Sequence, residues 1–259
     1  MQARAGEFAG FVAPGGGDHV QVVVAREGGA VPIDDAGAPI GESRTETVVD
    51  HSVEGGWIDL DVLVREKPAG VELGVIGAWA ARAPIGSPAV MMGPKGSVVL
   101  CGTPGEVVLA GDDSALPAVR RYLRMLGPSI TGHLLLETRF DLAALGIVPP
   151  RGVRVSILEP DSAPSAAVLA APGSAPGTAP RTAAGSAPST AAGSAPSTAP
   201  SAALAAALKS LPAPTNPLGR FVFACGEQSI VAPARALLVQ WGIDVERAVV
   251  KGYWKHATL

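Results

Sequence analysis

Hydrophobic and polar residues alternate in the first hundred positions in the way that β-strands with one buried face require. The clearest alternation is in Ile58, Asp59, Leu60, Asp61, Val62, Leu63 and Val64. A second short apolar run covers residues 20–25, and glycine and proline separate such runs. The pattern predicts a small antiparallel barrel or sandwich in this half of the chain.

The period changes after residues 102–105, which read GTPG. A short apolar strand at 106–111 is followed by helical spacing of Leu116, Val119, Leu123 and Leu126. Further strands are predicted in HLLLET, VRVSILE, RFVFAC and AVVKGYW, with a second helix in IVAPARALLVQW. Strands that alternate with helices indicate a parallel sheet covered on both faces. We therefore expect a β + α/β chain, with an antiparallel barrel at 1–103 and a doubly wound parallel domain at 104–259.

The segment from about 161 to 202 has a different composition from the predicted strands around it. It consists almost entirely of alanine, proline, serine and glycine, and TAAGSAPS occurs twice in tandem at 182–189 and 190–197. Such side chains bury too little apolar surface to offset the entropy of ordering. The composition predicts a disordered insertion within the parallel domain.

Charge and cysteine content narrow the possible partners of the chain. The 259 residues carry a net charge of −3, which gives no basic surface for a nucleic acid. Cys101 and Cys225 have no metal-ligand spacing, and no apolar run reaches about eighteen residues. The N-terminus has no signal-peptide pattern. We expect a cytoplasmic monomer with a small-molecule partner and no membrane insertion.

The first and last strand-to-helix turns of the parallel domain are alike. Both read strand, glycine, acid, any residue, serine, helix, in LAGDDSALPA and FACGEQSIVAPA. Gly111 and Gly226 suit a tight turn, and the serines suit helix capping. Turn chemistry alone explains the pattern equally well. A function is favoured by position, because ligands bind at the carboxyl ends of strands in an open α/β sheet.

Most of the common nucleotide-binding, catalytic and metal-binding motifs do not occur in the sequence. GxGxxG and P-loop patterns are missing, and Asp112 and Glu227 suit a ribose hydroxyl or a nicotinamide amide better than a phosphate. GxSxG and paired-histidine spacings are also missing, so we expect no catalytic nucleophile and no metal site. Arg44, in GESRTETVVDH, is either an ordinary solvated strand residue or the ligand of an anion.

Eight ordered motifs together resemble the siderophore-interacting proteins, the FAD-dependent ferric-siderophore reductases with a ferredoxin-reductase architecture. The motifs are GDHVQVVV at 17–24, RTET at 44–47, IDLDVLVR at 58–65, GVIGAWA at 74–80, GPKGS at 93–97, GDDSALPA at 111–118, ACGEQSIVAPARALL at 224–238 and GYWKHA at 252–257. The similarity covers nearly the whole chain apart from the 161–202 segment.

The resemblance implies FAD in the barrel and NAD(P)H in the parallel domain. It implies that Arg44 pairs with an FAD phosphate, with Thr45 and Thr47 positioning the flavin. Backbone amides of Gly77, Ala78 and Trp79 are then expected to hold the pyrophosphate. NAD(P)H is expected to bind through Gly111, Asp112, Ser114, Gly226 and Glu227. Hydride passes to FAD and single electrons pass to siderophore-bound ferric iron, so the protein aligns cofactors and needs no acid or base of its own.

The sequence departs from the family pattern in three places. Glu46 stands where the family has a tyrosine expected to stack on the flavin ring, so Glu46→Tyr is expected to raise FAD affinity. Arg65 stands where the family has histidine. We also expect about two strands that family members carry before FAGFVAP to be lacking here, either because the true start lies upstream of Met1 or because the chain is a decayed or repurposed member. Arg139 is a candidate for the 2′-phosphate of NADPH, against the alternative of a surface arginine. Glu46 and the shorter start favour an alternative to the reductase, a non-catalytic binding protein of the same fold. A flavin reductase with another acceptor is a third, broader option.

Overall fold

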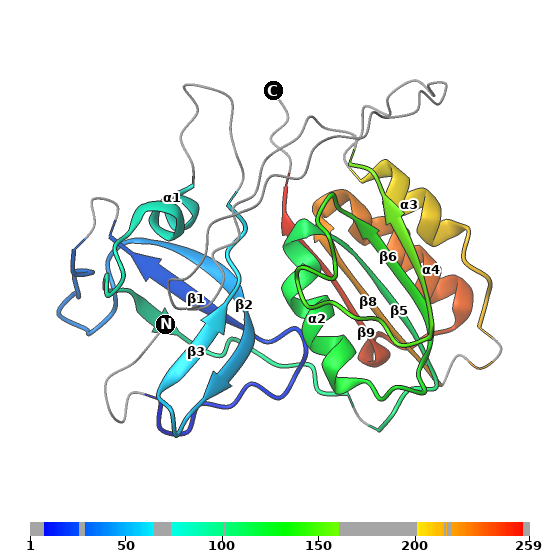
Figure 1. Ribbon diagram of the computed structural model, residues 1–259, viewed down its shortest axis with the longest axis horizontal. Coiled ribbons are helices and arrows are strands. Elements are labelled where there is room, and N and C mark those ends of the chain that lie inside the picture. The colour runs from blue at the N-terminus through cyan, green and yellow to red at the C-terminus, as the bar shows by residue number, and fades with distance from the viewer. Residues whose placement is uncertain are drawn as a thin grey trace, which may run out of the picture.

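The chain forms two lobes, one antiparallel and one parallel (Figure 1). The computed structural model describes residues 8–25, 29–64, 74–100, 102–160, 201–214, 216 and 219–255. Within these ranges, no helix combines the length and the apolar character needed to span a lipid bilayer. Predictions on Arg65, Cys101, His256 and residues 161–200 lie outside the described residues.

The first lobe is an antiparallel half-barrel of four strands in the order β3-β2-β1-β4. Its elements are β1 (His19–Val24), β2 (Glu42–Ser52), β3 (Trp57–Leu60), α1 (Val75–Arg82) and β4 (Val90–Met92). Val20 and Val22 of β1 pack against Val48 of β2 and Ile58 of β3 in a buried cluster, which the start of α1 also joins. Strand β3 ends at Leu60, so the strand predicted from the alternation in residues 58–64 is shorter than expected. Ile58 is buried as predicted, whereas residues 61–64 follow the strand and are half-buried.

The second lobe is a parallel sheet in the order β7-β6-β5-β8-β9. Its strands are β5 (Glu106–Asp112), β6 (Thr131–Glu137), β7 (Gly152–Leu158), β8 (Arg220–Glu227) and β9 (Ala248–Trp254). Its helices are α2 (Leu116–Met125), α3 (Ala202–Lys209) and α4 (Val231–Trp241), with 3₁₀ turns η1 (Asp113–Ala115), η3 (Gln228–Ile230) and η4 (Val245–Arg247). The doubly wound parallel domain is thereby confirmed.

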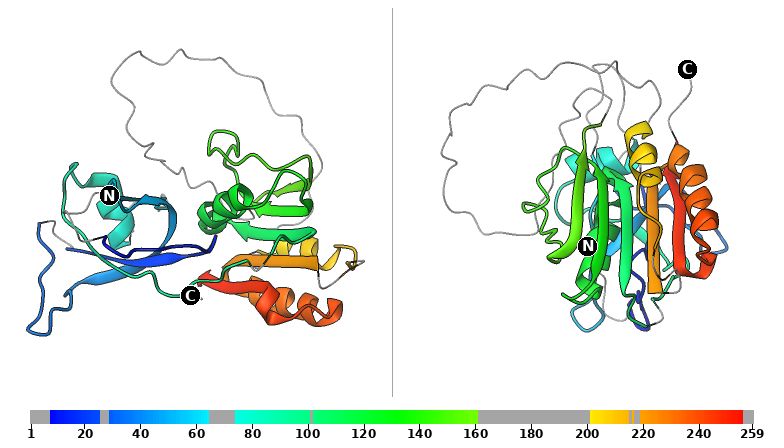
Figure 2. Two further views of the ribbon diagram at one scale, coloured as in Figure 1. Left: turned by 90° about the horizontal axis from the view of Figure 1, so that it is seen from below. Right: turned by 90° about the vertical axis from the view of Figure 1, so that its right-hand side faces the viewer.

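The two faces of the parallel sheet have separate cores (Figure 2). Val107 and Leu109 of β5 pack on the side of α2, whereas Val108 and Ala110 pack on the side of α3 and α4. This is why the central strands read as continuous apolar runs rather than alternating ones. Strand order reverses between β5 and β8, so their carboxyl ends form the switch point where ligands bind in such sheets.

Helix α3 begins at Ala202, where the predicted insertion ends, and was not predicted from the sequence. The sequence of this helix is as rich in alanine as the preceding repeat, so composition alone does not distinguish the helix from the predicted insertion. Leu204 and Leu208 lie one turn apart, and both are fully buried against the sheet. Their spacing is the signal that predicts this helix.

The two lobes meet mainly where α2 packs on β2. Arg121 of α2 donates hydrogen bonds from Nη1 to the Val48 carbonyl at 2.8 Å and from Nη2 to the Ala13 carbonyl. Burial lowers the pKa of the Arg121 guanidinium below its ordinary value, and the carboxylates of Asp18 and Asp50 oppose this shift. The arginine therefore ties the parallel lobe to the backbone of the half-barrel.

Candidate functional site

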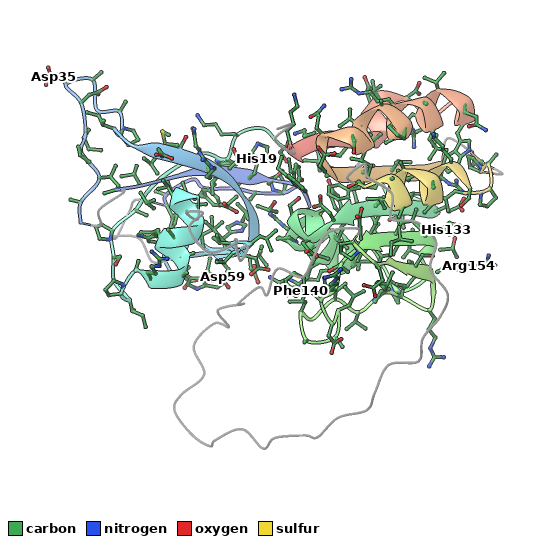
Figure 3. The ribbon with its side chains drawn as sticks, turned by 90° about the horizontal axis from the view of Figure 1, so that it is seen from above. His19, Asp35, Asp59, His133, Phe140 and Arg154 are labelled. Atoms are coloured by element: carbon green, nitrogen blue, oxygen red, sulfur yellow. The ribbon has the colours of Figure 1, made fainter. Side chains whose placement is uncertain are left out.

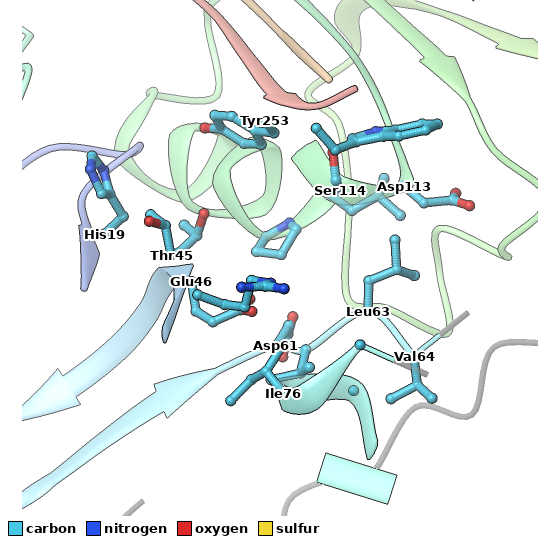
Figure 4. A pocket seen from close by; sticks show the side chains of 18 of the residues that line it. His19, Thr45, Glu46, Asp61, Leu63, Val64, Ile76, Asp113, Ser114 and Tyr253 are labelled. Carbon is cyan, nitrogen blue, oxygen red and sulfur yellow. The ribbon is translucent and has the colours of Figure 1, made fainter. Parts of the chain in front are cut away.

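A cleft of about 900 Å³ lies between the two lobes (Figure 4). The half-barrel contributes β1, β2, the residues after β3 and the start of α1. The parallel lobe contributes η1, α2, the loop after β6 and the end of β9. A cleft of this size falls within the range of small-molecule and cofactor sites. Figure 3 shows His19 and Phe140 between the lobes, and His133 and Arg154 far from the cleft.

Strand β2 presents the predicted flavin motif to the cleft. Arg44, Thr45 and Thr47 all line it. The Arg44 side chain is half exposed, its Nη1 donates to the Ser43 carbonyl at 2.7 Å, and its Nη2 lies 3.9 Å from the Glu42 carboxylate. A cation held this loosely at the wall of a cleft remains able to reorient toward an anionic ligand.

Glu46 also lines the cleft, between Thr45 and Thr47. It pairs across the sheet with Val20, which is fully buried. Burial raises the pKa of the Glu46 carboxyl to about 7, and the nearby Arg44 guanidinium partly opposes the rise. The carboxyl is therefore divided between its neutral and charged forms near neutral pH.

Glu46→Gln is expected to stabilise the protein at high pH. A raised carboxyl pKa means that the folded state resists ionisation, so wild-type stability falls as pH rises from the unfolded pKa to about 7. At pH 8 we expect the variant to gain about 2 kcal/mol in unfolding free energy, allowing for solvent screening. Most of this gain is expected to be lost by pH 5. Chemical unfolding at both pH values measures it, and a gain independent of pH would contradict the raised pKa.

The start of α1 opens into the cleft through Gly74, Ile76 and Gly77. No atom of the described residues lies within 4 Å of a Cβ built on Gly77, although the residue itself is buried. The Ala78 amide donates to the Gly74 carbonyl at 2.9 Å, and Trp79 packs on the core of the half-barrel. Amides of the first helical turn, rather than those of Ala78 and Trp79, lack intrahelical acceptors and are available for an anion.

Asp112 joins the carboxyl ends of three parallel strands. Its Oδ2 accepts from the Glu227 amide and from Trp254 Nε1, both at 2.8 Å. Its Oδ1 accepts from the Ser114 amide at 2.8 Å and the Ser114 hydroxyl at 2.5 Å. The carboxylate is buried and does not line the cleft. Its four protein donors give it a structural role, and its direct contact with NAD(P)H stays a prediction.

The two turn glycines make this arrangement possible. A Cβ on Gly226, which has φ of +154°, would lie 2.8 Å from Asp112 Oδ2. A Cβ on Gly111 would lie 2.4 Å from the Ala115 Cβ. Glu227 accepts from the Ser229 amide at 2.6 Å and is itself buried. Of the five residues predicted to bind NAD(P)H, only Ser114 lines the cleft.

Sequence reasoning missed several residues of the cleft wall. Arg120 of α2 lies 2.7 Å from the Asp61 carboxylate, so an ion pair joins the two lobes at the cleft. The available signal was the Arg120–Arg121 doublet, two adjacent cations in an otherwise amphipathic helix. The end of β9 contributes Lys251, Gly252, Tyr253, Trp254 and Lys255. Its GYWKHA motif was recognised but received no role.

Arg139 lies away from the cleft. Its Nε is 3.5 Å from the Glu159 carboxylate, and its Nη2 donates to the Pro160 carbonyl at 3.0 Å. It does not line the cleft wall. The location fits the surface arginine that was the alternative to a 2′-phosphate ligand.

The half-barrel joined to a doubly wound parallel domain defines a ferredoxin-reductase-like protein. The chain shares this fold with the FAD/NAD-binding domain of nitric oxide dioxygenase from Vibrio cholerae, with a TM-score of 0.55, 12% identity and coverage of 95% of this chain and 87% of that one. It shares it also with a siderophore utilization protein from T. fusca, with a TM-score of 0.65, 22% identity and coverage of 97% and 84%.

The sequence itself identifies the family. The family model described as siderophore-interacting protein matches residues 104–183 and 160–257, which together exceed half of the chain. The chain belongs to the siderophore-interacting protein family. An uncharacterized protein of Mycobacterium tuberculosis (strain H37Rv) is 36% identical over 113 residues, which are 44% of this chain. The match spans 38% of that relative's length.

Proposed function

We propose that this protein is a reductase that passes electrons from NAD(P)H through FAD to siderophore-bound ferric iron, for iron release in the cytoplasm. The observation that carries the proposal is the cleft between the lobes. It brings Arg44, Thr45, Thr47 and Gly77 of the half-barrel together with Ser114 at the switch point of the parallel sheet. Two nucleotide sites that meet at one cleft suit electron transfer between two cofactors.

The half-barrel side of the cleft fits the phosphates of FAD. Arg44 supplies a forked cation on the wall, and the first turn of α1 supplies backbone amides and the positive end of its dipole. Gly77 leaves room for close approach. Thr45 and Thr47 add hydroxyl groups beside the position expected for the flavin ring.

The parallel side fits a nicotinamide nucleotide at the switch point. Asp112 fixes the ends of β5, β8 and β9, and this places Ser114 on the cleft wall. The Ser114 hydroxyl and the backbone of η1 are then the groups that meet the ligand. The Lys251 and Lys255 side chains on the same wall offset the negative charge of nucleotide phosphates.

The chemistry itself belongs to the cofactor. A bound FAD would supply hydride acceptance from NAD(P)H and one-electron delivery to two ferric ions in turn. The contribution of the chain is to bind both nucleotides in one cleft, to orient them and to exclude water. The Arg121 and Arg120 contacts between lobes hold the two binding surfaces in a fixed relation.

Glu46 favours a second candidate function, a non-catalytic binding protein with the same fold. A carboxyl group offers no face on which a flavin ring stacks. With FAD held by its phosphates alone, the chain would keep a nucleotide site and lose efficient electron transfer. A flavin reductase with another acceptor is the third possibility.

The flavin spectrum separates these candidates. The purified chain is expected to be yellow or to become so with added FAD, and to bleach when NAD(P)H is added without oxygen. Addition of a ferric siderophore is then expected to restore the oxidised spectrum. A preparation that takes up no FAD would overturn the reductase proposal. Flavin that bleaches but is not reoxidised by any ferric siderophore would favour another acceptor.

Arg44→Ala is expected to weaken FAD binding by about tenfold or more. Charge-assisted hydrogen bonds contribute about 1.5–3 kcal/mol each, and the alanine variant loses them. Titration of flavin fluorescence measures the dissociation constant. The matched control is Arg82→Ala at the exposed end of α1, which removes the same charge outside the cleft. Equal weakening in both variants would show that Arg44 contributes only general charge.

A further inference from the structure

Glu46 is a carboxyl group in a cleft wall that otherwise carries more positive than negative side chains. The positive groups that line the described cleft are Arg44, Arg120, Lys251 and Lys255. The other negative groups are Asp61 and Asp113, and the other titratable groups are His19 and Tyr253. Asp61 is engaged by Arg120 at 2.7 Å. Among the described residues no ion pair of this kind is found for Glu46, although its charge interacts with that of Arg44.

The strand geometry couples Glu46 to Arg44. The two residues are two positions apart on β2, so their side chains leave the same face of the strand. Their partners across the sheet, Val20 and Val22, are almost fully buried, which keeps water from one side of the pair. A charge on Glu46 is therefore poorly screened from whatever Arg44 binds.

We propose that Glu46 determines the ligand charge that the cleft accepts, admitting phosphate-bearing ligands when its carboxyl is neutral and opposing them when it is ionised. The inference rests on the proposed function for the ligand class, a nucleotide pyrophosphate. It goes beyond that function because it assigns selectivity to a residue that departs from the family motif.

Two effects act in the same direction. An ionised Glu46 offsets the positive charge of Arg44, and it also repels a phosphate at the same wall. The neutral form does neither and adds a hydrogen-bond donor to the cleft. Burial sets the carboxyl pKa at about 7, so the neutral form prevails at pH 6 and the charged form at pH 8.5. Affinity is thus expected to fall as pH rises through 7.

ADP-ribose and FAD are the probes for this inference. Their phosphates are diesters without the monoester ionisation that occurs near pH 6, so the ligands keep the same phosphate charge across the range. ADP-ribose lacks the flavin ring and isolates the phosphate effect. Calorimetric titration of the full chain is expected to show affinity for both ligands falling about tenfold between pH 6 and pH 8.5. Glu46→Gln is expected to bind at pH 8.5 as tightly as the wild type does at pH 6.

Two control variants test whether Glu46 is responsible. Glu42→Gln removes an exposed carboxylate from the same face of β2, also close to Arg44. His19→Gln removes a histidine that lines the cleft. Histidine is the side chain that most often changes charge near neutral pH. Both are expected to keep the wild-type fall in affinity. A fall that persists in Glu46→Gln, or vanishes in either control, would overturn the inference.

A ligand-free measurement separates this inference from the proposed function. The infrared difference between wild type and Glu46→Gln is expected to show a protonated carboxyl band that disappears as pH rises through about 7. A band lost well below pH 6 overturns the inference and leaves the reductase proposal standing. If the band titrates near 7 but neither probe binds at any pH, both the ligand class and the reductase proposal are overturned.

Discussion

Asp112→Ala is expected to lower the free energy of unfolding by about 4 kcal/mol, which corresponds to the loss of a buried hydrogen-bond network. Four donors from η1 and the ends of β8 and β9 converge on this carboxylate, and two of them are backbone amides that would be left without an acceptor. The variant is also expected to lose NAD(P)H binding, since Ser114 is no longer held at the cleft. Chemical unfolding and nucleotide titration measure the two effects.

The control for this variant is Asp244→Ala. Asp244 is an exposed aspartate that precedes η4 and whose side chain makes no capping hydrogen bond. Its replacement is expected to change stability by no more than about 0.5 kcal/mol. Similar losses in the two variants would show that the Asp112 network contributes little. Stability lost without any loss of NAD(P)H binding would show that Ser114 does not depend on Asp112.

Arg121→Ala is expected to lower the free energy of unfolding by about 3 kcal/mol and to weaken the association of the lobes. The guanidinium donates to the carbonyl groups of Val48 and Ala13, and the variant leaves both without this donor at a part-buried interface. Because the cleft is formed by both lobes, electron transfer from NAD(P)H is expected to slow more than binding of either cofactor weakens. Chemical unfolding and stopped-flow flavin reduction test the two statements.

Arg124→Ala is the matched control for Arg121. It lies one turn further along α2, its Nη1 is 4.0 Å from the Asp50 carboxylate, and both side chains are more than half exposed. A surface pair of this kind contributes about 0–1 kcal/mol. If Arg124→Ala slowed flavin reduction as much as Arg121→Ala, the positive charge of α2 rather than the backbone contact would be responsible.

The architecture was predictable because local patterns and the overall fold agree. The alternation predicted a strand with Ile58 buried, although β3 ends at Leu60, and the change of period after Gly105 marked the parallel sheet. Helix α3 was missed because alanine dominates its sequence. The helix packs through two buried leucines, Leu204 and Leu208. Two apolar residues next to a long alanine-rich repeat are too few to predict a helix from the sequence.

The candidate site was predictable only in part. The motifs located Arg44 and Ser114, which line one cleft although 70 positions separate them in the sequence. They did not show that Asp112 is occupied by protein donors, because that depends on Trp254 and on the register of β8 beside β9. The Arg120–Asp61 ion pair depends on how the lobes pack and has no local sequence pattern.

Helix α2 has a consequence for how the cleft can open. The same ten-residue helix follows the turn that carries Ser114 and bears the arginines that contact β2 and Asp61. A separation of the lobes on this side would break those contacts. The α2–β2 contact is therefore the part of the interface between the lobes that we expect to stay closed when a ligand binds.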